Sequence, residues 1–263
     1  MRADKYFSEK FGSRTKSAEA IEKGLVLVNG KRIRPKDEIN GTEEIFFPVA
    51  EENFVSNGGY KLSRAIKTFN FNCKNKVFAD IGASTGGFSD CLLQNGARKI
   101  YAVDVGESLL HERLANDSRI IKMENTNARY LTNSDFPEPI NGVTIDVSFI
   151  SLKLILPAIK EILSADGDAL LLIKPQFECE KKNIGKSGIV HPSSHAKIVK
   201  GIVEFCIEIG LYPFEIVNAP VRKGKNLEYV LHVKPTELGA ISVSTIENTI
   251  KDFVKLNSLN ELK

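Results

Sequence analysis

The sequence predicts an α/β protein in which a small N-terminal α+β domain precedes a larger domain with a mostly parallel, doubly wound sheet. Two observations predict the larger domain. Apolar strands alternate with amphipathic helices from residue 77 onward, which is the order that a parallel sheet requires. A glycine-dense loop also follows the first of these strands. Residues 1–48 stand apart, because they combine short helices with a basic hairpin.

The N-terminal segment is predicted to contain two helices and a hairpin. Residues 4–11 suit one short helix, and Ser13 can cap a second helix over residues 14–23 that Gly24 ends. The pair Asn29-Gly30 then follows alternating valines, which is the strongest two-residue hairpin signal. Residues 1–40 hold ten Lys+Arg and six Asp+Glu, a net charge of +4. This charge suits an RNA-backbone clamp, although most charge runs are only solvated surfaces.

The larger domain is predicted element by element from its apolar periodicity. A first helix is expected over residues 62–68. The final two strands have no helix between them, which suggests an antiparallel addition at the sheet edge. Strands are expected at 77–80, 100–105, 120–123, 143–147, 169–173, 212–218 and 227–233, and further helices from 88 and at 109–115, 152–163, 195–209 and 244–256.

The composition excludes several classes of protein. The chain has 263 residues, 42% of them hydrophobic and 26% charged, with a net charge of +3. No stretch approaches the ~18 apolar residues of a membrane span, and the charged N-terminus is not a signal peptide, so we expect no membrane association. Four scattered cysteines without a C-x-x-C pair predict reduced thiols in the cytoplasm. His191 and His195 flank Pro192 without a ligand partner, so no metal site is expected.

The segment Val77–Phe88, VFADIGASTGGF, carries the most informative motif. A buried strand ends at Asp80, and a loop with three glycines leads into a helix. Glycines allow sharp turns and leave room for a nucleotide-like ligand. The next strand, KIYAVDV, ends at Asp104, where an acid can accept both ribose hydroxyls of an adenosine.

Three nucleoside cofactors compete for this loop. A NAD site requires G-x-G-x-x-G, but three residues separate Gly82 from Gly86. A P-loop requires G-x-x-x-x-G-K-[ST], and before Gly185 the first glycine is replaced by Glu180. S-adenosylmethionine (SAM) needs an acid near its methionyl end and another at its ribose, so Asp80 and Asp104 favour SAM. The alternative is a tight turn in an arbitrary α/β domain.

Polar residues also close three other predicted strands. Asp146 ends VTID, Lys174 ends ALLLIK, and Glu228 opens EYVLHV. Ligands bind beyond the carboxyl ends of strands in open α/β sheets, so these side chains are expected at the cofactor edge. A lysine that is partly desolvated beside carboxylates can be tuned toward catalysis. A structural ion pair is the competing interpretation.

Residues 1–35 resemble an S4 domain, an RNA-binding module of ribosomal and RNA-modifying proteins. Ser13-Arg14, Ala18 and Ile21 match its helix with one spacer shifted, and residues 24–30 match its G-x-V-x-V-N-G segment. The resemblance implies RNA binding. The basic residues assigned to it are Arg2, Lys5, Arg14, Lys16, Lys31, Arg32 and Arg34.

The full chain resembles the TlyA, or hemolysin A, family of ribosomal RNA methyltransferases. The motifs that carry the resemblance are DIGASTGGFSD, YAVDVG, ENTNARYL, IDVSFISLKLILPA, LIKPQFE, IGKSGIVHP and NLEYVLHV. The family joins an S4 domain to an FtsJ-like, Rossmann-like SAM-dependent methyltransferase domain. The implied division is an S4-like domain at 1–48, a linker at 49–60 and the methyltransferase domain at 61–263.

This resemblance implies 2′-O-methylation of a cytidine ribose, in 23S rRNA first and 16S rRNA second. It assigns the catalytic Lys-Asp-Lys-Glu tetrad to Lys61, Asp146, Lys174 and Glu228. In that assignment Lys174 is the base or stabilises the forming alkoxide, Asp146 orients it, and Lys61 and Glu228 set its charge state and hold the ribose. The implied cofactor-binding residues are Asp80, Gly82, Ala83, Ser84, Thr85, Gly86, Gly87, Phe88, Asp104, Val105, Asn125 and Asp146.

Two departures from the family pattern stand out. Asn57 replaces the arginine of the usual S-R-G motif, and the segment after Gly106 lacks the usual polar residues. We expect a monomer that works on ribosomal subunits. The alternatives are a membrane-damaging hemolysin, as the older family name suggests, or a non-catalytic ribosome-assembly factor. A pseudouridine synthase is disfavoured, because its G-R-L-D string is missing.

Overall fold

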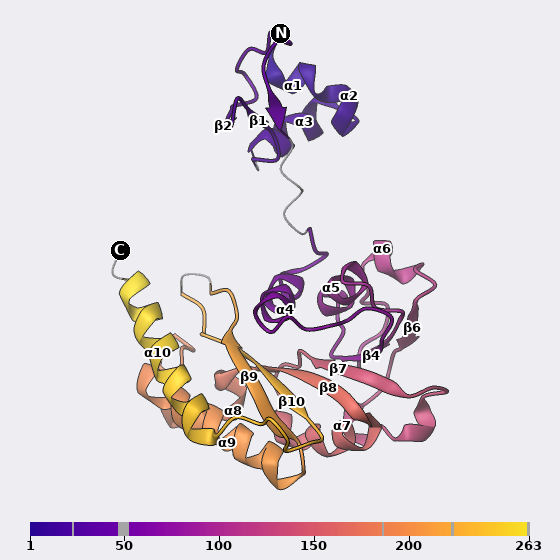
Figure 1. Ribbon diagram of the computed structural model, residues 1–263, viewed down its shortest axis with the longest axis vertical. Helices are drawn as coiled ribbons and strands as arrows, with labels where there is room; N and C mark the ends of the chain where they lie inside the picture. Colours follow the sequence, from indigo (N-terminus) through magenta and orange to yellow (C-terminus); the bar gives the residue numbers. More distant parts are fainter. Residues whose placement is uncertain (23, 47–52, 186, 222–223, 262–263) are drawn as a thin grey trace. The chain divides into compact units, whose positions relative to one another are not determined.

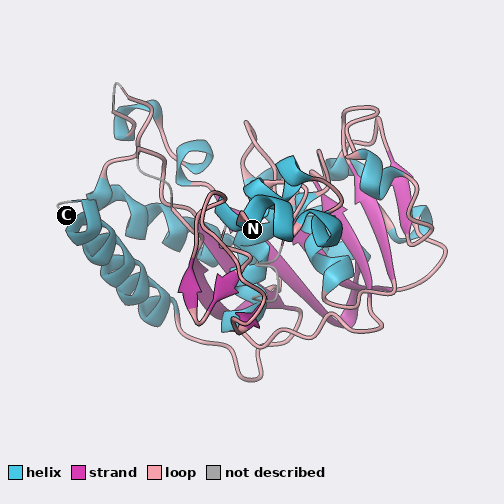
Figure 2. Cartoon of the chain, turned by 90° about the horizontal axis from the view of Figure 1, so that it is seen from above, coloured by secondary structure: helices cyan, strands magenta, loops and turns pink. Residues whose placement is uncertain are grey.

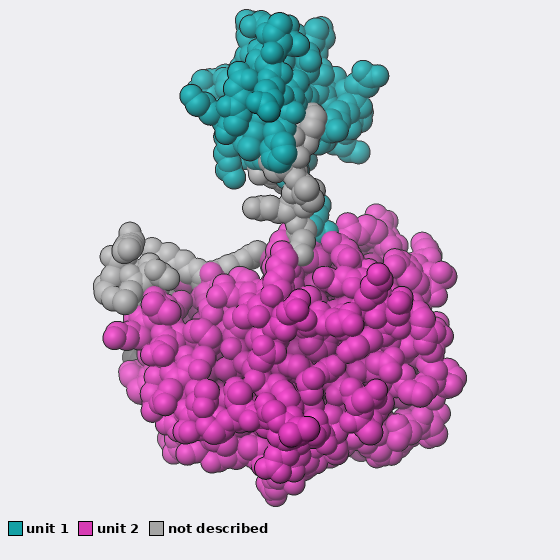
Figure 3. Space-filling model, in the orientation of Figure 1, with its two compact units in different colours: residues 1–53 teal, residues 54–263 magenta. Residues whose placement is uncertain are grey.

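The computed structural model describes residues 1–22, 24–46, 53–185, 187–221 and 224–261. These residues form two compact units, Met1–Asn53 and Phe54–Lys263 (Figure 3). Each unit has its own apolar core, so each is described by itself.

Unit 1 contains three short helices and a three-stranded antiparallel sheet. The helices are α1 (Ala3–Tyr6), α2 (Ser8–Phe11) and α3 (Arg14–Glu22). The single helix expected over residues 4–11 is therefore divided, with Phe7 between the two turns and buried in the core. The strands β1 (Leu27–Val28), β2 (Lys31–Arg32) and β3 (Ile45–Phe46) have the order β2-β1-β3. The core residues are Ala3, Phe7, Ile21, Val26, Val28 and Ile39.

Unit 2 is built on a seven-stranded sheet with the order β6-β5-β4-β7-β8-β10-β9. Its first five strands are parallel, and β10 is antiparallel to both β8 and β9, as the missing helix between the last two strands predicted. Figure 2 shows these strands side by side with helices around them. The bounds are β4 (Val77–Ile81), β5 (Lys99–Val103), β6 (Ile120–Met123), β7 (Ile140–Ile145), β8 (Leu163–Ile173), β9 (Tyr212–Asn218) and β10 (Tyr229–Lys234).

Helices cover both faces of this sheet, with α4 and α5 on one face and α7 and α9 on the other (Figure 1). The sheet is therefore doubly wound, as the sequence predicts. The α-helices are α4 (Asn57–Thr68), α5 (Gly87–Gln94), α6 (Glu112–Ala115), α7 (Leu156–Ile162), α8 (Pro175–Glu178), α9 (His195–Glu208) and α10 (Val243–Glu261). The 3-10 helices are η1 (Ala128–Tyr130), η2 (Asn133–Asp135), η3 (Leu152–Leu154), η4 (Lys181–Asn183) and η5 (Pro192–Ser194).

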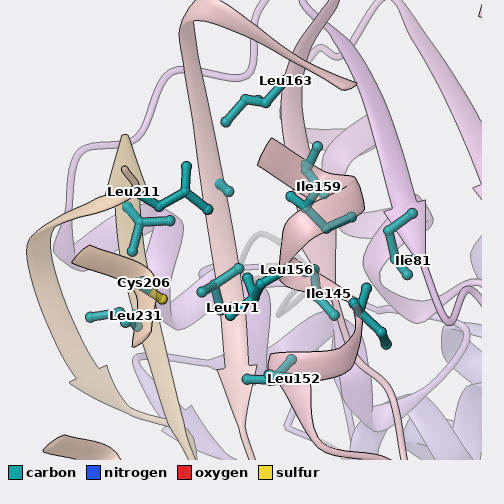
Figure 4. Close-up of a cluster of buried hydrophobic side chains, with 14 of the residues drawn as sticks. Ile81, Ile145, Leu152, Leu156, Ile159, Leu163, Leu171, Cys206, Leu211 and Leu231 are labelled. Atoms are coloured by element: carbon teal, nitrogen blue, oxygen red, sulfur yellow. The ribbon is translucent and has the colours of Figure 1, made fainter. Parts of the chain in front are cut away.

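The central strands contribute alternate side chains to two cores. Leu171 and Ile173 of β8 pack on the face of α7 and α9, whereas Leu170 and Leu172 pack on the face of α4 and α5. A strand that is buried on both faces is apolar without interruption, which explains the run ALLLI. Figure 4 shows part of the first core, where Leu171 lies near Leu156, Cys206 and Leu231.

Several predicted boundaries differ from the structure. The helix expected over 152–163 is η3 followed by α7, because α7 begins anew at Leu156 with Pro157 in its first turn and Leu163 already pairs in β8. The predicted linker 49–60 overlaps unit 2, because Phe54 is buried and α4 begins at Asn57. Residues 47–52 of that segment lie outside the described residues. The helix expected from residue 109 begins only at Glu112.

Candidate active site

The glycine loop after β4 lies where the strand order reverses, between β5 on one side and β7 on the other. Such a switch point opens a crevice at the carboxyl ends of the strands. Gly82 has φ +77°, and a Cβ there would lie only 2.7 Å from the carbonyl oxygen of Asp146. Any side chain would therefore push the β7 segment away. Gly87 is required for a similar reason, because its Cβ would lie 2.1 Å from Ser56 Oγ.

A first cavity of about 160 Å³ lies directly over this loop. Among its walls are Asp146 and Lys174, which extend from the ends of β7 and β8. Eight residues of the predicted site line it, namely Gly82, Ala83, Ser84, Thr85, Gly87, Phe88, Asp146 and Lys174. Ser56, Gly58 and Ser148 line it as well, and sequence reasoning missed them.

A second cavity of about 420 Å³ shares Gly82, Ser84, Asp146 and Ser148 with the first. Its volume is in the range of small-molecule sites, roughly 300–1,000 Å³. The predicted residues Asp104 and Val105 line it, together with the apolar side chains Leu109, Ile150 and Ile155. An acid beside an apolar wall suits a nucleoside, because the ribose needs acceptors and the base needs a flat apolar contact.

Asp104 is held in place by the glycine loop. Its Oδ2 accepts a hydrogen bond from the backbone N–H of Ser84 at 2.8 Å, and its Oδ1 accepts one from Gly106 at 2.8 Å. Ser84 donates from a left-handed conformation with φ +47°. The glycine loop after β4 and the acid at the end of β5, which the sequence predicts to bind one cofactor, are therefore joined directly.

Three predicted cofactor residues line neither cavity in the part of the chain that the structure describes. Asp80 is fully buried, and its carboxylate accepts hydrogen bonds from Ser89 Oγ at 2.6 Å and Thr144 Oγ1 at 2.9 Å. A direct contact of Asp80 with a ligand is therefore not available, and Asp80 joins β4, α5 and β7 instead. Burial, the largest influence, raises the pKa of Asp80 to about 6.

Gly86 and Asn125 are the other two predicted cofactor residues that line neither cavity among the described residues. Gly86 has φ +90°, and a Cβ there would meet Leu114 at 2.3 Å, so this glycine serves packing against α6. Asn125 is exposed, and its backbone N–H donates to the Gly106 carbonyl. The neighbouring Asn127 lines the second cavity instead. The motif ENTNARYL contains both asparagines. The sequence could not tell which of them faces the cavity, because both follow the end of β6, where strand alternation no longer applies.

Asp146 and Lys174 form the first ion pair of the predicted tetrad. Lys174 Nζ lies 2.6 Å from Asp146 Oδ1, and their side chains are only 10% and 20% exposed. This contact lacks hydrogen-bond geometry, since Asp146 Oδ1 has no hydrogen-bond partner within the described chain. Lys174 instead donates to Ser148 Oγ at 2.8 Å. Of its three N–H donors, the ammonium group therefore uses one for Ser148 and keeps two for other partners.

Lys61 and Glu228 form the second pair. Lys61 Nζ donates to Glu228 Oε2 at 2.6 Å, and Gln176 Nε2 donates to Glu228 Oε1 at 3.3 Å. Tyr229 of β10 pairs with Ile173 of β8, so the next position outward sets Glu228 opposite Lys174. Both ion pairs therefore lie at one end of the sheet. Such an arrangement can hold a hydroxyl group and stabilise charge that develops on its oxygen.

The predicted RNA-binding residues of unit 1 are all exposed. Arg2 and Arg14 form ion pairs with the buried Asp4 at 2.8 and 3.1 Å, and Arg34 pairs with Asp37 at 3.2 Å. The carboxylates hold these guanidinium groups in place while leaving N–H donors for an anion. Lys5, Lys16, Lys31 and Arg32 complete the exposed set.

Two features are absent from the described residues. No helix there combines the length and apolar character that a membrane crossing demands. No group of three or more His, Cys, Asp or Glu side chains in the same ranges is arranged to hold a metal ion.

Comparison with known proteins gives matches over nearly the whole chain. The model of the FtsJ-like methyltransferase family matches residues 54–234, and the S4 domain model matches residues 1–45. Hemolysin A of Brachyspira hyodysenteriae is 39% identical over 238 residues, 88% of this chain and 99% of that protein. The 16S/23S rRNA (cytidine-2′-O)-methyltransferase TlyA of Mycobacterium tuberculosis (strain ATCC 25618 / H37Rv) is 35% identical over 246 residues, 90% of each chain.

The solved structures agree with this result. A structure from Streptococcus thermophilus superposes with a TM-score of 0.75 at 36% identity, covering 100% of this chain and 98% of that one. The family model covers most of unit 2, including the glycine loop and all four tetrad residues. The chain therefore belongs to the FtsJ-like methyltransferase family and carries an S4 domain before its methyltransferase domain.

Proposed function

We propose that this protein transfers a methyl group from SAM to the ribose 2′-hydroxyl of a cytidine in ribosomal RNA, with 23S rRNA as the main target. The observation that carries the proposal is the Asp146–Lys174 pair, which lines the same cavity as the glycine loop. Family membership supplies the methyl-transfer chemistry, and the TlyA relative suggests the cytidine ribose.

The residues around the two cavities fit SAM. Asp104 would hold the ribose hydroxyls, and Leu109, Ile150 and Ile155 would cover the adenine. The loop from Gly82 to Thr85 lacks large side chains, so the methionyl part would lie against backbone in the first cavity. Bound SAM supplies an electrophilic methyl group, and no metal is required.

The protein's own part is to position the hydroxyl and manage its proton. An N–H of Lys174 that is not bonded to Ser148 would hold the 2′-oxygen, while Asp146 lies beside the ammonium group as its counter-charge. Methyl transfer would break the bond between the methyl carbon and sulfur as the new O–C bond forms. The hydroxyl proton would pass to the Asp146–Lys174 pair, in which the carboxylate can accept it while the ammonium group stabilises the charge on the oxygen. Lys61 and Glu228 would hold the ribose from the β10 side. Such positioning can lower a barrier by about 7–11 kcal/mol in favourable cases.

We further propose that residues 1–48 form the RNA-binding domain and residues 49–60 connect it to the methyltransferase domain. The exposed basic residues of unit 1 support this assignment. The site in unit 2 would distinguish RNA from DNA by the 2′-hydroxyl, which only RNA carries. Unit 1 would supply the salt-dependent part of the affinity for RNA. A ribosomal substrate implies a cytoplasmic protein, and we propose that it acts as a monomer.

The test is tritium transfer from labelled SAM onto ribosomal subunits from cells that lack this protein. We expect the label in 23S rRNA, in an alkali-resistant dinucleotide that contains a 2′-O-methylated cytidine. The Lys174→Ala variant should bind SAM normally and transfer almost no label. Label on a base would overturn ribose methylation, and full activity of the variant would overturn the role of Lys174.

A further inference from the structure

A third cavity, of about 250 Å³, lies beside α8 and α9. It shares no residue with the first two cavities, and neither the tetrad nor the glycine loop contributes to it. Its walls include Lys153, Lys182 and Lys197 together with Glu178 and Glu180. The charges of these five side chains decide what the cavity can bind.

The two carboxylates of this cavity are already occupied. Glu178 accepts hydrogen bonds from Ser151 Oγ at 2.6 Å and from the Leu152 backbone N–H at 2.8 Å. Glu180 forms an ion pair with Lys182 at 2.8 Å. Lys153 and Lys197, by contrast, form no ion pair within 4.0 Å among the described residues, although Lys153 still attracts Glu178 and Lys197 still attracts Glu180 electrostatically. The three lysines and two glutamates together give the cavity walls a net formal charge of +1, which favours an anion between Lys153 and Lys197.

The cavity lies next to the proposed reaction site. Lys174 caps the N-terminus of α8 and Glu178 ends it, so the two are about one helical turn apart, roughly 5.4 Å along the axis. The loop that carries Asp146 and Ser148 continues to Ser151 and Lys153, and Glu178 ties this loop to α8. Both segments that carry the first ion pair thus continue into walls of the third cavity.

We propose that this third cavity binds a phosphodiester group of the RNA strand that flanks the ribose to be methylated, with Lys153 and Lys197 as its charged contacts. The inference rests on the proposed function, because it assumes an RNA strand across the site. Lysines serve as point charges for phosphate. Phosphate contacts position a nucleic acid rather than read its sequence, so this one would set the register of the target ribose.

The experiment compares the Lys153→Gln/Lys197→Gln double variant with wild type in the full-length protein with SAM bound. RNA affinity and the KM for RNA are measured between low and high salt. We expect the KM to rise roughly fivefold, as for loss of partly exposed ionic contacts. The salt slope of RNA binding should fall by about 0.7 for each lost phosphate contact with single-stranded RNA. SAM affinity should stay unchanged.

Lys200→Gln is the matched control. Lys200 lies on the same helix as Lys197 but lies 3.8 Å from Glu204 and from Glu247, and it does not line the cavity. The control should keep the KM and the salt slope of wild type. A double variant that also keeps both values would overturn the inference.

Two further outcomes separate this inference from the proposed function. If wild type transfers no methyl group to RNA, the proposed function fails, and the salt slope of RNA binding still tests the cavity. Inorganic phosphate is the probe for a free anion. If phosphate binds wild type but not the double variant, while RNA affinity is equal in both, the cavity holds a free anion and the RNA contact is wrong.

Discussion

Replacing Ser148 with alanine tests whether Lys174 needs a second partner to work. Lys174 Nζ donates to Ser148 Oγ at 2.8 Å, and its contact with Asp146 lacks hydrogen-bond geometry. Ser148 is therefore the residue that directs the hydrogens of the ammonium group. In Ser148→Ala the group would rotate about its axis, and the N–H assigned to the 2′-oxygen would lose its direction.

The size of the effect follows from the burial of the pair. A hydrogen bond to a charged group contributes about 1.5–3 kcal/mol. Lys174 is only 10% exposed, so water can replace the lost hydroxyl only in part. At 1.36 kcal/mol per factor of ten, kcat should fall roughly tenfold to hundredfold. Ser148→Thr keeps a hydroxyl and should recover most of the activity.

The assay is single-turnover methyl transfer at saturating SAM and RNA, with SAM affinity measured separately by calorimetry. We expect a loss of rate that saturation does not restore, with SAM affinity changed by less than about threefold. A Ser148→Ala enzyme with wild-type rate, or one whose whole defect is weaker SAM binding, would refute this reasoning. Ser148 would then be only part of the cavity wall.

Three further changes test the surroundings of the site. Gly87→Ala should weaken SAM binding, because the added Cβ would lie 2.1 Å from Ser56 Oγ. Such overpacking costs about 1–3 kcal/mol. A second change, Ser56→Ala, should restore part of the SAM affinity measured by calorimetry. Burial opposes ionisation of Asp168, but hydrogen bonds from His232 and from two lysines hold its pKa well below its usual range. Ionised Asp168 therefore stabilises the folded protein above about pH 4, and this stabilisation is lost as the pH falls below that value. Asp168→Asn should lower the free energy of unfolding, measured in urea at pH 7, by about 3–5 kcal/mol. Because the pKa of Asp80 is raised to about 6, wild type should lose stability as pH rises from about 4 to 6, and Asp80→Asn should flatten that part of the curve.

Much of the fold could be predicted from sequence because its signals are local. The apolar run ALLLI predicted the strand that forms the second half of β8, and the missing helix between β9 and β10 predicted their antiparallel pairing. The weaker predictions were helix starts and ends. Pro157 and Leu163 divide a continuous apolar pattern between a 3-10 helix, α7 and β8, and periodicity cannot distinguish those three.

The site could be predicted in part. Strand ends located Asp104, Asp146 and Lys174 at one edge of the sheet, since parallel strands finish together there. Strand ends alone could not say which way a side chain points. Asp80 also closes a strand motif, yet its carboxylate faces the interior between Ser89 and Thr144.

Taken by itself, the sequence determined the succession of strands and helices along the chain, the need for glycine after β4 and the residue types available at each strand end. These follow from short-range periodicity and backbone sterics. Tertiary structure alone decided which partners meet. Lys61 and Glu228 are 167 positions apart, and Ser148 and Lys174 are 26 apart, but each pair lies within hydrogen-bond distance. Such contacts depend on how helices and loops pack on the sheet, which no local pattern encodes.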